Sequence, residues 1–231
     1  MIDARDVCYT YPNGVDVLKG VSFHIPSGNK FALVGANGAG KSTLLSLLCA
    51  LEYPQAGSIL IGGLPLDKEH TQKIRDLVGM VFQNPDDQLF MPTVYDDVAF
   101  SLRNRGVSEA DTAAQVNALL ETMNLSALKD RPPFRLSGGE KRMAAIATAL
   151  AIKPKLLLMD EPTAYLDPRA RKHFIHLIQK LDVGMLIATH DLHLVQECMD
   201  GVLILKEGHI FAQGEPSLLE DTQLLENALL A

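Results

Sequence analysis

The chain has 231 residues, of which 47% are hydrophobic and 21% charged, and its formal net charge is −7. This length and composition are typical of a globular protein with a sizeable core, built as one large domain or two small lobes. The acidic balance excludes non-specific nucleic-acid binding, which needs a basic face, and it disfavours direct docking on anionic lipid. We therefore expect any link to a membrane to run through a protein partner.

The three cysteines, Cys8, Cys49 and Cys198, are widely spaced and odd in number, so they build neither a disulfide framework nor a paired metal motif. We expect all three to be small buried hydrophobes in a reducing compartment. The N-terminus lacks a signal-peptide layout, and the longest apolar run, around Met143–Ile152, is about half of the roughly 20 residues that span a bilayer. These features predict a cytoplasmic location.

Apolar runs and turn residues predict the elements in chain order. Strands are expected at Val7–Tyr11, Val17–Ile25, Lys30–Val34, Ser58–Ile61, Leu77–Phe82, Leu156–Asp160, Gly184–Thr189 and Val202–Leu205. Helices are expected at Lys41–Leu51, Val94–Arg105, Ser108–Met123, Gly138–Ile152, Pro168–Leu181 and Leu192–Met199, with an amphipathic packing helix at Leu218–Leu230. Strands that alternate with helices predict a mostly parallel sheet covered by helices. The expected fold is α/β, one domain over residues 1–231, with a core lobe of 1–92 plus 153–231 and a helical lobe of 93–152.

The segment Gly35–Ser42 reads Gly-Ala-Asn-Gly-Ala-Gly-Lys-Ser, a full match to the phosphate-binding loop GxxxxGK[ST]. It follows an expected strand and opens an expected helix, as this loop requires. Glycines let backbone N–H groups turn toward phosphate oxygens, and the helix N-terminus adds a favourable dipole. Lys41 should reach the β- and γ-phosphates, and Ser42 should ligate magnesium. The alternative is a chance glycine-rich turn.

A second element lies far downstream, where four apolar residues deliver Asp160 and Glu161 to the carboxyl end of a buried strand. Ligands of open α/β sheets bind at that edge. Asp160 can hold magnesium through water, and Glu161 can polarise the attacking water. Alone, such an acidic pair is more often a cap or a turn. Together the two motifs specify a P-loop ATPase or GTPase.

Residues 136–140 read Leu-Ser-Gly-Gly-Glu, followed by Lys141-Arg142 and an apolar helix. Ser137 with two glycines at a helix N-terminus makes a second anion site, although an ordinary serine cap has the same pattern. The segment resembles the LSGGQ signature of ABC ATPases, with Glu140 in place of the usual glutamine. Gln83 resembles the Q-loop residue of that family, Ala164–Asp167 its D-loop, and His190 its switch histidine. Tyr11 resembles its adenine-stacking aromatic residue.

The resemblance spans nearly the whole chain in the family order, and it implies a RecA-like P-loop core with an N-terminal antiparallel β subdomain and an inserted helical subdomain. It implies that Tyr11 stacks on adenine, that Glu161 is the general base, and that His190 contacts the γ-phosphate. The loop residues implied to hold ATP are Gly35, Asn37, Gly38, Ala39, Gly40, Lys41, Ser42 and Thr43. Gln83, Ser42 and Asp160 are implied at Mg²⁺, with Gln83 sensing the ion and transmitting the state of the site to the partner.

The same resemblance implies a head-to-tail dimer. Ser137, Gly138 and Gly139 would bind the ATP held by the opposing subunit, and Asp167 would cross the interface. Two-fold symmetry then completes two sites at once. A second copy is favoured because the chain carries every catalytic element, while a close paralogue as partner stays open.

After Gln83 the chain reads Asn-Pro-Asp-Asp-Gln-Leu-Phe, which is similar to energy-coupling factor (ECF) ATPases, most of all to their cobalt and nickel branch. This resemblance implies import of a transition-metal ion or a vitamin such as biotin. It also implies two membrane partners, a transmembrane coupling subunit and a small substrate-binding subunit, so the chain would lie at the cytoplasmic face of the membrane. We expect Leu89–Pro92 to form an apolar patch for a coupling helix, unless these residues form a buried loop.

Two further interpretations stay open at this point. A soluble ABC ATPase, for example one of iron–sulfur cluster assembly, would carry the same motifs, whereas a regulator without turnover conflicts with the presence of Glu161 and His190. His173 and His176, like His190 and His193, have the spacing of metal ligands on a helix, but no third ligand lies nearby in the sequence. We therefore expect solvated helix histidines.

Overall fold

Two β-sheets organise the computed structural model, which describes residues 1–164 and 166–228. The antiparallel sheet has the order β2-β1-β4-β5 and consists of β1 (Ile2–Thr10), β2 (Asp16–Ile25), β4 (Ala56–Ile61) and β5 (Leu64–Pro65). The larger sheet has the order β10-β9-β3-β8-β7-β6, with β3 (Lys30–Val34), β6 (Val78–Val81), β7 (Leu156–Asp160), β8 (Gly184–Ala188), β9 (Gly201–Lys206) and β10 (His209–Gly214). All its pairs are parallel except that of β10 with β9.

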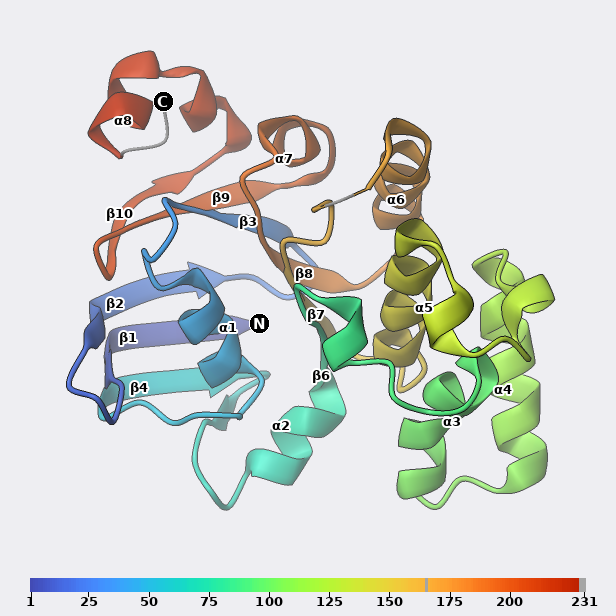
Figure 1. Ribbon diagram of the computed structural model, residues 1–231. Coiled ribbons are helices and arrows are strands. Elements are labelled where there is room, and N and C mark those ends of the chain that lie inside the picture. The colour runs from blue at the N-terminus through green and yellow to red at the C-terminus, as the bar shows by residue number, and fades with distance from the viewer. Residues whose placement is uncertain (165, 229–231) are drawn as a thin grey trace.

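Figure 1 shows where the helices lie relative to the two sheets. Helix α1 (Lys41–Leu48) packs between the two sheets, and α3 (Val94–Asn104), α4 (Glu109–Thr122) and α5 (Gly138–Leu150) stand together at one end beside α6 (Pro168–Lys180). Helices α2 (Thr71–Leu77), α7 (Leu192–Cys198) and α8 (Thr222–Asn227) and 3₁₀ turns at Pro85–Asp87, Ser126–Leu128, Pro133–Arg135 and Pro216–Glu220 complete the described chain. No helix in this part of the chain is long and apolar enough to cross a bilayer.

The larger sheet has a core on each face, because successive side chains of a strand point to opposite sides. Leu156 and Leu158 of β7 pack with α1 and the antiparallel sheet, whereas Leu157 and Met159 pack with α5, α6 and α7. Strands buried on both faces read as continuous apolar runs, as these do. The parallel strands therefore end at one common edge, where β3 and β7 deliver the residues that follow them.

The structure confirms the α/β class, with a parallel sheet, an antiparallel N-terminal sheet and a group of inserted helices. The predicted strand Val7–Tyr11 starts too late, because β1 begins at Ile2 and kinks near Asp6, whose φ is 50°. The predicted helix Lys41–Leu51 is too long: α1 ends at Leu48 and Ala50 has a φ of 56°.

The prediction of one C-terminal helix over Leu218–Leu230 is wrong. A 3₁₀ turn ends at Glu220, and Asp221 then caps a new short helix by accepting a hydrogen bond from the Leu224 amide at 3.0 Å. The last two residues of the predicted helix lie outside the described part of the chain. The cysteine prediction holds only for Cys49, since Cys8 and Cys198 are half-buried.

Candidate functional site

The phosphate-binding loop follows β3 and is compressed against the neighbouring strand. A Cβ atom on Gly35 would lie 2.3 Å from the Leu205 carbonyl oxygen, so only glycine fits there. Gly40 caps α1 with a φ of 110°, a left-handed conformation that side chains rarely adopt. The loop can therefore turn its amides toward the N-terminus of α1, which is the arrangement that binds phosphate.

Lys41 is buried at the start of α1, and its ammonium donates hydrogen bonds to the carbonyl oxygens of Gly35 and Ala36 at 2.6 and 3.2 Å. These contacts hold the positive charge over the loop, where a phosphate chain would meet it. The Tyr11 and Thr43 hydroxyls lie 3.0 Å apart, so the aromatic ring is tied to the first turn of α1.

Two buried carboxylates lie at the carboxyl end of β7. Asp160 ends the strand, and Glu161 has a φ of 43°, which is strained for a residue other than glycine. The Glu161 amide donates to the Ala188 carbonyl oxygen of β8 at 2.8 Å, which fixes the turn. Glu161 Oε2 lies 2.9 Å from His190 Nδ1, and the imidazole is 73% exposed. A buried acid is thus paired with a base that remains open to a ligand.

One cavity of about 390 Å³ brings most of the predicted residues together. Its predicted lining residues are Tyr11, Asn37, Gly38, Gly40, Lys41, Ser42, Thr43, Gln83, Asp160 and Glu161. Asn13, Val15 and Val17 also line it and are not predicted, because neither the expected turn at 12–14 nor the expected strand from Val17 carries a nucleotide-binding motif. Gly35 and Ala39 belong to the loop but do not line the cavity. His190 does not line it either, and it joins the site through its contact with Glu161.

The cavity contains oxygen donors suited to Mg²⁺, which prefers carboxylate, hydroxyl and carbonyl oxygens and keeps several waters. Ser42, Gln83 and the buried carboxylate of Asp160 face this one space. The donor set therefore fits a magnesium ion carried in with phosphate oxygens.

The signature residues lie apart from this cavity. Ser137 and Glu140 form a capping box at the start of α5: Ser137 donates its amide and its hydroxyl to Glu140 Oε2 at 2.7 and 2.8 Å. These bonds from Ser137 hold the pKa of Glu140 below its usual range. Ser137 and Gly139 line another cavity with Asp167, and Gly138 lines a third. Asp167 caps α6 by accepting from the amides of Arg169 and Ala170, whereas Tyr165 of the predicted D-loop lies outside the described residues.

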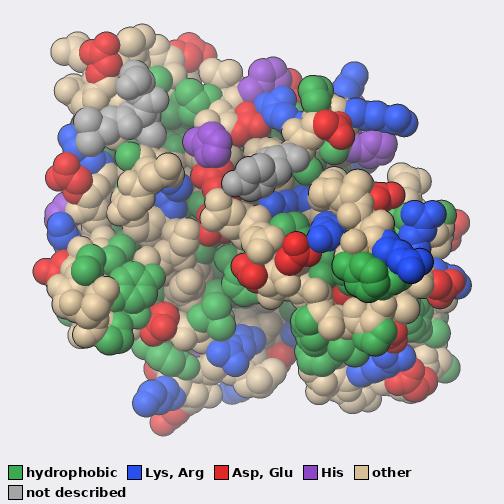
Figure 2. Space-filling view, in the orientation of Figure 1, with side chains coloured by type: hydrophobic (Ala, Val, Ile, Leu, Met, Phe, Trp, Pro, Cys, Tyr) green, Lys and Arg blue, Asp and Glu red, His purple; other side chains and the backbone are tan. Residues whose placement is uncertain are grey.

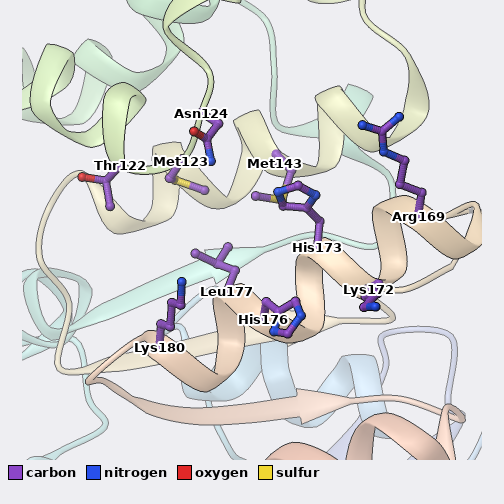
Figure 3. A pocket seen from close by; sticks show the side chains of 10 residues that line it. All are labelled: Thr122, Met123, Asn124, Met143, Arg169, Lys172, His173, His176, Leu177 and Lys180. Carbon is purple, nitrogen blue, oxygen red and sulfur yellow. The ribbon is translucent and has the colours of Figure 1, made fainter.

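A cavity of about 550 Å³ lies between α6 and the α4–α5 region and is not the nucleotide site (Figure 3). His173 points across it toward Met143, and His176 lies one turn further along α6. The surrounding side chains are thioether, aliphatic, hydroxyl, amide and basic groups, and within the described chain no cluster of three or more His, Cys, Asp or Glu could hold a metal ion.

The segment after Gln83 differs in part from its prediction. Leu89 is buried, so it does not belong to the expected surface patch, whereas Phe90 is 64% exposed. Phe90 packs edge-to-face on the exposed ring of Phe100 at a centroid distance of 5.0 Å. Apolar side chains gather over α3 and the adjoining loop in Figure 2. Asp97, a carboxylate whose pKa burial raises, supports this turn by accepting from the amides of Phe90 and Met91.

Comparisons with known proteins agree on one family. The profile of the family described as ABC transporter matches residues 18–164. The energy-coupling factor transporter ATP-binding protein EcfA of Methanothermobacter thermautotrophicus is 40% identical over 236 residues, which cover 100% of this chain and 76% of the relative.

Among solved structures, cbiO1 of Clostridium perfringens, described as part of the ABC transporter complex cbiONQ, superposes with a TM-score of 0.86. It is 35% identical, and the alignment covers 98% of this chain and 92% of that one. The ATP-binding cassette MJ0796, solved as a dimer with ADP and Pi, has a TM-score of 0.84 at 27% identity, with 94% and 99% covered.

Proposed function

The chain belongs to the ABC transporter family of ATP-binding proteins, and from this premise we propose that it is the ATP-hydrolysing subunit of an ECF-type importer. The observation that carries the proposal is the separation of two half-sites on one chain. The phosphate loop, Gln83 and the two carboxylates line one cavity, while Ser137 and Gly139 line another. A second copy placed head to tail would join each half to its complement.

The residues of the first cavity account for ATP hydrolysis. Loop amides and Lys41 would hold the β- and γ-phosphates, and Tyr11 would face adenine. Ser42, Gln83 and Asp160 would hold Mg²⁺, which supplies charge neutralisation of the phosphates when bound. Glu161 is positioned to take a proton from the attacking water, since its carboxylate is buried beside the cavity. His190 would orient Glu161 through their 2.9 Å contact and present its exposed ring to the γ-phosphate.

The solute and the membrane partners are inferred from relatives. The names EcfA and cbiONQ support a transporter with membrane subunits, and the Phe90–Phe100 pair offers an apolar anchor for a helix of the coupling subunit. We infer import of a transition-metal ion or a vitamin, with this chain at the cytoplasmic face of the membrane. Phe90→Ala should leave ATP hydrolysis intact and reduce uptake, and Phe134→Ala, at a ring 77% exposed, is the matched control.

The deciding experiment uses a tagged Glu161→Gln variant, purified with ATP from solubilised native membranes. Loss of the general base should lower turnover by about 10²–10⁴-fold while ATP still binds and dimerises the protein. Mass spectrometry should then identify a transmembrane coupling subunit and a small integral membrane protein. Recovery of only soluble partners would overturn the transport assignment, and unchanged ATP hydrolysis would overturn the role of Glu161.

A further inference from the structure

Arg142 has the least exposed charged side chain in the described chain, at 2% of its surface, and ATP hydrolysis as proposed above makes no use of it. It lies in the second turn of α5, five residues after Ser137. A buried charge is costly unless its surroundings compensate for it. Its contacts therefore indicate what the charge does.

The guanidinium joins α5 to the backbone that carries Gln83. Its two terminal nitrogens donate to the carbonyl oxygens of Phe82 and Gln83 at 2.7 and 2.6 Å. Burial lowers the Arg142 pKa, and attraction to Asp160 opposes that shift. One cation thus contacts the Q-loop backbone and is attracted by the carboxylate that ends β7.

A second side chain, which extends from the segment after β6 toward α5, connects the same two segments. Gln88 accepts a hydrogen bond from the Phe82 amide at 3.1 Å and donates to the Ala145 carbonyl oxygen and the Thr148 hydroxyl at 2.8 and 2.7 Å. At the surface, Lys141 pairs with Asp86 at 2.5 Å. The contacts of buried Arg142 and half-buried Gln88 can therefore be compared with this exposed ion pair, which joins the same two segments.

The two groups that face Arg142 both belong to the nucleotide cavity. Gln83 follows β6, which pairs in parallel with β7 so that Val81 lies opposite Met159, next to Asp160. The Gln83 and Asp160 side chains both line the cavity. A shift of the Gln83 backbone, or a change in the charge balance at Asp160, would therefore act on the guanidinium.

We propose that Arg142 is a positioning residue that couples nucleotide occupancy of one site to the presentation of Ser137 at the other. A helix transmits displacement as a rigid rod, and five residues span about 7.5 Å along its axis. Gln88 also joins the segment of residues 82–88, which carries Gln83, to α5, so the segment and the helix move together. The inference rests on the proposed dimer and specifies how its two sites communicate.

The test compares Arg142→Lys with Lys141→Ala, both in the Glu161→Gln background. Lysine keeps the charge but cannot donate to both carbonyl oxygens in the fixed geometry of a guanidinium. Nucleotide affinity is measured with a fluorescent ATP analogue on dilute, monomeric protein, and ATP-driven dimerisation is measured by sedimentation. The Hill coefficient of ATP hydrolysis is measured on the same substitutions in the chain that retains Glu161.

We expect Arg142→Lys to change the affinity of the monomer for the ATP analogue by no more than about twofold and to weaken ATP-driven dimerisation by about tenfold or more. The Hill coefficient of hydrolysis should fall close to one, because the two sites are then no longer coupled. Lys141→Ala should change none of the three. Equal losses in nucleotide binding and dimerisation, or unchanged dimerisation, would overturn the coupling role. If Arg142→Lys does not fold, Gln88→Met decides by the same criteria. Failure of the Glu161→Gln parent to dimerise would instead contradict the proposed function.

Discussion

Replacing Glu140 with glutamine should tighten the ATP-driven dimer. Glu140 Oε2 lies 2.8 Å from the Ser137 hydroxyl oxygen and accepts a hydrogen bond from it. Because Ser137 lowers the Glu140 pKa, this carboxylate is ionised near neutral pH. A phosphate oxygen that accepts the Ser137 hydroxyl instead would come within about 5.5 Å of the carboxylate oxygen, given ordinary hydrogen-bond lengths. Two negative charges would then face each other at the interface.

The repulsion has a size that can be worked out from this distance. Two unit charges about 5.5 Å apart repel by about 0.8 kcal/mol in water and about 3 kcal/mol at the effective dielectric of a protein surface. Glutamine keeps the oxygen that accepts from the Ser137 amide but removes the charge. Since Glu140 is partly exposed, solvent screening favours the lower figure, so each site should tighten by about 4-fold, well short of the roughly 160-fold that 3 kcal/mol would give.

The assay is sedimentation of the Glu161→Gln protein with MgATP, with and without Glu140→Gln, at low and high salt. The gain should shrink as salt rises, because the Debye length falls from about 10 Å at 0.1 M to about 3 Å at 1 M. Glu220→Gln removes the same charge from an exposed position in the C-terminal 3₁₀ turn and should have no effect. A weaker dimer in Glu140→Gln, or a gain that salt does not change, would refute the reasoning.

Three further outcomes follow from the structure. Gly35→Ala places a Cβ 2.3 Å from the Leu205 carbonyl oxygen, so it should abolish ATP binding and lower the free energy of unfolding by at least about 2 kcal/mol. The control Gly38→Ala places its Cβ in open space and should lower that free energy by only about 1–2 kcal/mol, because of the positive φ. The pKa of Asp191 is raised by burial but lowered further by Arg171 and the Leu194 amide, so the net shift is downward. The contribution of Asp191 to the free energy of unfolding is therefore fully present above its unfolded-state pKa near 4, and it is lost as pH falls through its folded-state pKa. Asp191→Asn should lower the free energy of unfolding by about 1–2 kcal/mol and make that free energy less dependent on pH on the acid side. Burial raises the pKa of Cys49 to about 11, so a thiol reagent at pH 8 should label Cys8 first and reach Cys49 only on unfolding.

The sequence predicted what depends on contiguous residues. The phosphate loop and the strand ending at Asp160 are local patterns whose chemistry is tied to fixed spacing, and the structure places both at one cavity. Helix α2 and strand β10 were missed because the first buries only Ile74 and the second buries none of its side chains, so neither has the apolar periodicity of a core element.

Other features were unpredictable because they depend on contacts between distant segments. Leu89 is adjacent to Phe90 in an apolar stretch, and only packing against the helices decides which of the two is buried. The sequence equally places Arg142 in a charged pair at the start of an apolar helix. Its burial follows from the Phe82 and Gln83 carbonyl oxygens, which lie about sixty residues earlier in the chain.

The two half-sites are supported by different kinds of packing, and the proposed coupling through Arg142 depends on this difference. The phosphate loop is anchored to strands and to α1, whose leucines are interlocked with both sheets. The buried side of α5, the helix that Ser137 caps, is instead rich in alanine, with Ala144, Ala145 and Ala147 fully buried. Small side chains allow close approach but interlock little, so they resist sliding less than leucines do. Directional polar contacts, chiefly those of Arg142 and Gln88, then help to set the position of α5, and these contacts converge on the segment that carries Gln83.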